Sequence, residues 1–125
     1  MSEKNKKQFG IWMVSHHATI VGRLQPDSGD FVILAHENNP VRESSSNEYT
    51  ATNAERTLQH KFFKEITSHM QNAEELHVTG TGQVQEQFIH YIGETPQFKN
   101  TVAKESTSNK MSEEKLVEYI AKQFN

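Results

Sequence analysis

Cysteine is absent from this chain of 125 residues, which excludes disulfides and thiolate metal sites and fits a reducing compartment. Long apolar runs are absent as well, since none approaches the roughly 20 residues of a membrane-spanning helix. The apolar stretch from Phe9 to Val14 is too short for a signal peptide, and no small-residue cleavage site follows it. We therefore expect a cytoplasmic protein that does not bind a membrane.

Aspartate is nearly absent: only Asp27 and Asp30 occur, in the segment QPDSGD, whose proline and glycine indicate a turn. A nuclease of the ribonuclease H type needs several carboxylates that hold two divalent metal ions, with one acid on its first strand. The first strand expected here carries no acid. We therefore expect that the protein is not a two-metal nuclease and that it binds no cofactor.

Charge is of mixed sign, and the formal net charge is -3, which does not by itself indicate nucleic-acid binding. The length favours a single core, and we expect one domain over residues 8–125 after a flexible charged tail at 1–7. Basic residues nevertheless gather in one central stretch, at Arg42, Arg56, Lys61 and Lys64. A local surface that faces RNA is therefore compatible with the sequence.

Hydrophobic periodicity predicts the order β-β-β-α-β-α-β-α. The expected strands span 8–15, 18–24, 31–37, 76–80 and 100–106, and the expected helices span about 53–72, about 83–92 and a segment capped by Ser112. An antiparallel meander followed by right-handed β-α-β crossovers is the architecture of ribonuclease-H-like folds. The fold class expected is therefore α/β, a three-layer domain with a mixed five-stranded sheet.

Two of these elements carry specific signals. The near-continuous apolar run at 8–15 is typical of a strand that is covered on both faces, so it should be central in the sheet. Thr52 and Glu55 form a capping-box pattern, from which we expect the first helix to begin at about residue 53. The polar segment 38–51 is then an exposed loop, long enough to be functional or disordered.

Seven histidines invite a metal-binding interpretation, but their spacing argues against it. His60 and His69 fall on the first expected helix without sharing a ligating face, and His16 and His17 are neighbours at a turn, where adjacent residues point to opposite faces. Solvated or half-buried structural histidines are the favoured interpretation.

A glycine-rich turn, Gly80-Thr81-Gly82-Gln83, opens the second expected helix. Free backbone N–H groups at such a turn can hold an anion or a phosphate. The dinucleotide-binding fingerprint would need a third glycine, and Gln85 stands there. The alternative, which we favour, is that Gly80 and Gly82 only permit a tight turn between strand and helix.

The segment LHVTGTGQVQEQFIHYIGETPQFKNTVAKESTS resembles the central domain of Pelota and of the archaeal and eukaryotic class 1 release factors. Gly80, Gly82, Glu86, Phe88 and the segment 105–108 stand at matching places. Upstream, GIWMVSHHATIVGRL is similar to the opening hairpin of that domain, so the resemblance covers about residues 8–124. It implies the ribonuclease-H-like fold of the translational-machinery proteins.

Two departures from that family change what the resemblance implies. Release factors carry Gly-Gly-Gln in the long loop after the third strand, where the glutamine helps water attack peptidyl-tRNA. The loop here has no such tripeptide, and Gln83 lies on a different loop. The flanking domains of the family, which read the decoding site and recruit a GTPase, do not fit in 125 residues. The resemblance therefore implies a non-hydrolytic role in docking on the ribosome or on tRNA.

Three functional hypotheses follow. The first is a non-enzymatic, translation-associated protein that binds ribosomal RNA or tRNA through Arg42, Arg56, Lys61 and Lys64. The second is a protein-interaction or homo-oligomeric module of the same fold that does not bind RNA. The third is an enzyme that holds a nucleotide or another phosphorylated ligand at the turn from Gly80 to Gln83.

Overall fold

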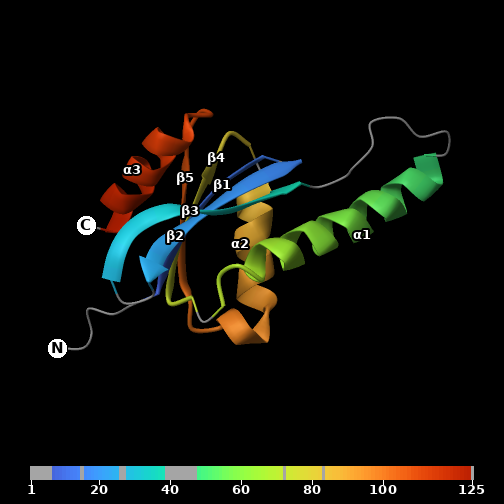
Figure 1. Ribbon diagram of the computed structural model, residues 1–125. Coiled ribbons are helices and arrows are strands. Elements are labelled where there is room, and N and C mark those ends of the chain that lie inside the picture. Colours follow the sequence, from blue (N-terminus) through green and yellow to red (C-terminus); the bar gives the residue numbers. More distant parts are fainter. Residues whose placement is uncertain are drawn as a thin grey trace.

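The computed structural model describes residues 7–14, 16–25, 28–38, 48–71, 73–82 and 84–124, and of residues 24, 25, 28, 29 and 48–56 the backbone alone. Figure 1 shows a twisted sheet between two layers of helices. Its elements are β1 (Gln8–Val14), β2 (His17–Gln25), β3 (Ser28–Asn38), α1 (Glu48–Thr67), β4 (Glu75–Gly80), α2 (Val84–Glu94), the 3₁₀ turn η2 (Pro96–Phe98), β5 (Val102–Thr107) and α3 (Glu113–Phe124). None of the helices among these described residues has the length and apolar character needed to span a membrane.

The sheet confirms the predicted topology, with the strand order β3-β2-β1-β4-β5. β1 is the central strand: it pairs antiparallel with β2, where Ile11 faces Ile20, and parallel with β4, where Ile11 faces Val78. β4 in turn pairs parallel with β5. Parallel neighbours need a crossover, and α2 with η2 supplies it between β4 and β5.

The central strand is apolar throughout because both of its faces are covered. Figure 1 shows α3 on one side of the sheet and α1 with α2 on the other. Ile11 and Met13 point into the core beneath α1 and α2, whereas Trp12, one residue along, joins the core beneath α3. The expectation drawn from the run at 8–15 is confirmed.

Helix α3 lies unusually close to the sheet at Gly10. A Cβ atom on this residue would collide with the side chain of Ile120, which is fully buried. The helix begins where the sequence predicts, because the Lys115 amide donates a hydrogen bond to the Ser112 hydroxyl at 3.2 Å.

The predicted boundaries of α1 are wrong at both ends. The helix begins at Glu48 rather than near residue 53, so Thr52 and Glu55 lie inside it and do not cap it. It ends at Thr67 rather than near 72. Beyond this residue the His69 and Met70 amides bond carbonyls three residues earlier, and the hydroxyls of Thr67 and Ser68 share the carbonyls of Lys64 and Glu65 with the Ser68 amide. Of the expected loop 38–51, Asn38 belongs to β3 and 48–51 to α1, and 39–47 lie outside the described residues.

Candidate functional site

The basic residues singled out from the sequence fall partly on one helix. Lys61 and Lys64 are exposed on α1, one turn apart, whereas the neighbouring Phe62 and Phe63 are buried. Within the described part of the chain, neither lysine takes part in an ion pair. Arg56 belongs to the same helix, but the structure describes only its backbone. Arg42 lies outside the described residues.

The glycine-rich turn has a packing role at its first residue. Gly80 ends β4, and a Cβ atom there would collide with the carbonyl oxygen of Met13 in the adjacent strand. The Gly80 carbonyl also accepts a hydrogen bond from the Ser108 amide at 2.8 Å. Gly80 is therefore required for the close approach of two strands, whether or not the turn binds an anion.

The rest of the turn is open to solvent. Thr81 and Gly82 are exposed, and a Cβ atom on Gly82 would meet nothing within 4 Å. Gln83 lies outside the described residues. Gln85, which stands in place of a third glycine, is buried and donates from Nε2 to the Ser106 carbonyl at 3.2 Å, so it ties the start of α2 to β5.

Beneath α3, the structure brings together an imidazole and a hydroxyl that no sequence spacing connects. His77 Nε2 lies 2.8 Å from Ser106 Oγ, which also contacts Thr79 Oγ1 at 3.0 Å and the Tyr119 hydroxyl at 2.7 Å. Burial, and after it the charge of Lys104, lower the pKa of His77 below its ordinary value. A neutral histidine beside a serine could in principle act as a base beside a nucleophile.

The surroundings of this pair favour a structural role. The three partners occupy the single donor and the two acceptor positions of the Ser106 hydroxyl, so none is left for a substrate. Tyr119, on α3, is one of these partners and ties the helix to the sheet. The sequence showed only that His77 and Ser106 lie on strands. Their contact depends on the parallel register of β4 and β5.

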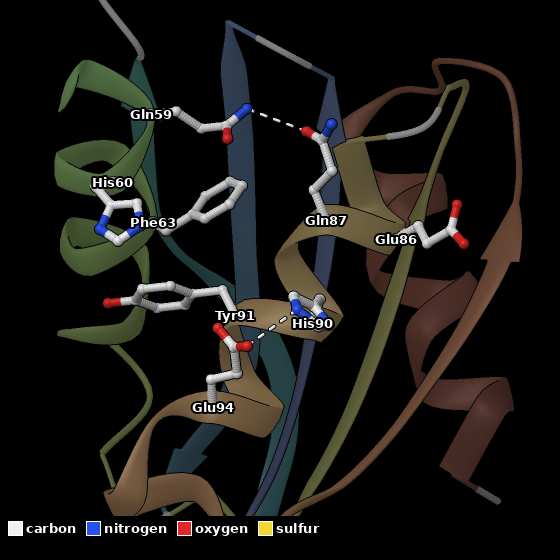
Figure 2. A pocket seen from close by; sticks show the side chains of 8 residues that line it. All are labelled: Gln59, His60, Phe63, Glu86, Gln87, His90, Tyr91 and Glu94. Atoms are coloured by element: carbon white, nitrogen blue, oxygen red, sulfur yellow. Dashed lines mark hydrogen bonds and ion pairs between the residues drawn. The ribbon is translucent and has the colours of Figure 1, made fainter. Parts of the chain in front are cut away.

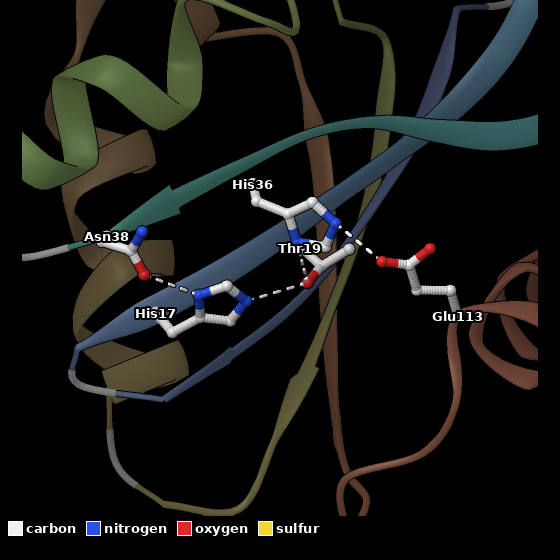
Figure 3. A network of polar contacts seen from close by, with 5 residues as sticks. All are labelled: His17, Thr19, His36, Asn38 and Glu113. Atoms are coloured by element: carbon white, nitrogen blue, oxygen red, sulfur yellow. Dashed lines mark hydrogen bonds and ion pairs between the residues drawn. The ribbon is translucent and has the colours of Figure 1, made fainter.

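A second polar cluster, on the same face of the sheet, joins β2 and β3 to the start of α3 (Figure 3). Its contacts run from Asn38 to His17 at 2.8 Å, on to Thr19 at 3.2 Å, to His36 at 3.1 Å and to Glu113 at 2.8 Å. The rings of His17 and His36 stack with centroids 5.5 Å apart. Across the residues that the structure describes, no three histidine or acidic side chains are placed to hold a metal ion.

A hollow lies between α1 and α2, and we call it the α1–α2 groove (Figure 2). It has a volume of about 460 Å³ and is lined by Gln59, His60 and Phe63 of α1 and by Glu86, Gln87, His90, Tyr91 and Glu94 of α2. The ring of Tyr91 meets His60 edge to face at 5.7 Å and lies 5.4 Å from the ring of Phe63. None of the lining residues was predicted as a binding residue from the sequence.

Polar contacts span or border this groove. The Gln59 side-chain amide donates to the Gln87 side-chain oxygen at 3.1 Å and so links the two helices. His90 lies 3.1 Å from Glu94, one turn farther along α2. The signal that could have located the groove is the polar and aromatic composition of one side of each helix, but only the packing of α1 beside α2 combines the two sides.

Fold and site together define a three-layer α/β domain with a mixed five-stranded sheet and surface sites on its helices. No protein-family model matches the sequence, and no curated protein matches it either. Solved structures do match. Pelota of Thermoplasma acidophilum matches with a TM-score of 0.63 and 13 % identity over 97 % of this chain. Pelota of Archaeoglobus fulgidus matches with a TM-score of 0.60 and 15 % identity, also over 97 % of this chain.

An archaeal translation termination factor, aRF1, matches with a TM-score of 0.61 and 14 % identity over 95 % of this chain. The chain spans about a third of the length of each protein: 34 % and 32 % of the two Pelota chains and 35 % of aRF1. At such low sequence identity, the similarity shows a shared fold. The resemblance to Pelota and the release factors is therefore confirmed for the fold.

Proposed function

We propose that this chain is a non-enzymatic, translation-associated domain that binds ribosomal RNA or tRNA. The observation that carries the proposal is the fold shared, over nearly the whole chain, with Pelota and with a protein named as a translation termination factor. The contact between the buried His77 and the half-buried Ser106 supports the non-enzymatic part, because the hydrogen-bonding capacity of the Ser106 hydroxyl is already used within the fold.

The proposed RNA contacts lie on α1 and in the segment before it. Lys61 and Lys64 are exposed and unpaired among the described residues, so they can neutralise phosphates without breaking an existing ion pair. Arg42 and Arg56 are proposed to extend the same surface. The turn from Gly80 to Gln83 is a further candidate phosphate contact, since Thr81 and Gly82 are exposed before the start of α2.

Sedimentation of the protein with ribosomes from a cell lysate tests this proposal. We expect co-migration that weakens as salt is raised, because neutralised phosphates release counterions on binding. Lys61→Glu together with Lys64→Glu should reduce co-migration strongly. Lys99→Glu, an exposed lysine beyond α2, is the matched control and should have little effect.

Two outcomes would contradict the proposal. One is a protein that stays at the top of the gradient even at low salt. The other is an association that resists both salt and complete nuclease digestion, which would favour a protein partner instead. Light scattering on the purified protein would then show whether that partner is a second copy of the chain.

A further inference from the structure

The walls of the α1–α2 groove are rich in ring systems. Phe63 is 2 % exposed, and the half-buried Tyr91 and the exposed His60 extend the cluster to the surface. Figure 2 shows these three side chains gathered in the space between the two helices. Aromatic and imidazole rings of this kind are the side chains on which proteins stack unpaired bases of single-stranded RNA.

The two glutamines of the groove supply hydrogen-bonding groups of both kinds. In the bond between them, Gln59 uses one amide hydrogen and Gln87 uses its carbonyl oxygen. This leaves the Gln59 carbonyl oxygen and the Gln87 amide nitrogen without a partner among the described residues. An acceptor and a donor side by side match the edges of nucleobases, which carry both.

The charges around the groove favour a base inside it and a phosphate outside. Glu94, which borders the groove, would repel a phosphate there, and it is engaged with His90. Figure 2 shows Glu86 pointing away from the rings, on the far side of α2. Lys64 follows His60 by one helical turn on α1, so its exposed ammonium group can reach a phosphate at the rim.

We propose that the α1–α2 groove binds a single unpaired nucleobase, which stacks on the ring of Tyr91 with His60 at its edge and bonds the free amide groups of Gln59 and Gln87. The volume of about 460 Å³ suits one nucleoside and is far too small for a duplex. This inference rests on the proposed function for its biological meaning, since it names the part of an RNA that this surface would hold.

The four uncharged ribonucleosides are the probes, because they carry the base without the phosphate. We expect millimolar adenosine, guanosine, cytidine or uridine to shift NMR signals of the Gln59 and Gln87 side-chain amides and of the Tyr91 ring. Tyr91→Leu should weaken binding of the preferred nucleoside by at least about fivefold, the low end of the loss when one stacking ring is removed. Tyr91→Phe, which keeps the ring, should retain most of the affinity.

Further variants separate base recognition from folding. Gln87→Ala changes an exposed side chain and should weaken binding while leaving the thermal unfolding midpoint nearly unchanged. Gln97→Ala, an exposed glutamine on η2 outside the groove, should change neither quantity. Equal binding by the wild type, Gln87→Ala and Tyr91→Leu would overturn the proposal.

The nucleoside titration and the sedimentation experiment together distinguish failure of the base site from failure of the proposed function. Nucleoside shifts at the groove without any co-migration with ribosomes would support the base site and reject the ribosomal role. Salt-sensitive co-migration, with no nucleoside shifts at millimolar concentration, would reject the base site and leave the ribosomal role standing.

Discussion

At the scale of single residues, His77 stands out among the described residues because its surroundings shift its pKa. Its side chain is 8 % exposed and is held by Ser106 beneath α3. Burial disfavours the charged imidazolium, and the nearby Lys104 disfavours it further, so the pKa of His77 is lowered from 6.5. His77 therefore serves the fold in its neutral form.

We predict that His77 makes the free energy of unfolding dependent on pH. Between the lowered pKa of the folded state and 6.5, the unfolded chain binds a proton that the folded chain excludes, so stability rises with pH. The contribution is complete above 6.5 and is lost as the pH falls through the folded pKa. Urea unfolding at several pH values should show this loss in the wild type and a smaller one in His77→Gln.

An NMR titration is the direct control, since it follows the His77 ring itself. An apparent pKa at or above 6.5 would contradict both the burial argument and the prediction.

At the scale of elements, the turn between β4 and α2 contains two glycines. Each could be present for close packing or for binding an anion. Gly80 faces the backbone of Met13 with no room for a side chain, whereas Gly82 faces open space. The glycine-rich pattern alone could not distinguish packing from anion binding. The structure assigns a packing role to Gly80 and gives none to Gly82.

We predict that Gly80→Ala lowers the free energy of unfolding by about 1–3 kcal/mol or more, because a methyl group forces β1 and β4 apart. Gly82→Ala is the matched control and should change stability by no more than about 0.5 kcal/mol, as for an ordinary surface position. Urea denaturation measures both. Similar losses for the two variants would mean that the turn does not have the close strand contact described at Gly80.

At the scale of the whole molecule, the two sides of the sheet differ in character. On the α3 side, two polar clusters tie the helix to the strands through Tyr119 and Glu113. On the other side, α1 and α2 leave a groove lined by aromatic and amide groups, with exposed lysines on α1 beside it. Of the proposed RNA contacts that the structure describes, Lys61 and Lys64 lie on α1, and Thr81 and Gly82 lie in the turn between β4 and α2.

We predict that the protein does not hydrolyse peptidyl-tRNA. The family resemblance places Gly-Gly-Gln in the loop after the third strand, where the glycines let the backbone approach the ester, but residues 38–53 contain no glycine. A release assay with stalled ribosomes should therefore remain at background. Release above background that is lost in Gln83→Ala would contradict the prediction and assign a catalytic role to the other loop.

The kind and the order of the helices and strands could be predicted from the sequence. A short, near-continuous apolar run indicates a strand covered on both faces, and helical spacing indicates a helix with one buried face, so the central place of β1 and the α/β class could be predicted. The C-terminal end of α1 could not be predicted in this way, because after Thr67 the amides change to carbonyls three residues earlier, where the hydroxyls of Thr67 and Ser68 also bond. The spacing of apolar residues carries no information about these local hydrogen bonds.

Which polar residues contact one another depends on tertiary packing. Gln59 and Gln87 are 28 positions apart, and His77 and Ser106 are 29 apart, so their contacts are absent from any local pattern. The first contact depends on how α1 packs beside α2, and the second on the register of two parallel strands. Both are set by the burial of apolar side chains elsewhere, such as Phe63 and Val78, and the polar groups meet where that packing brings them.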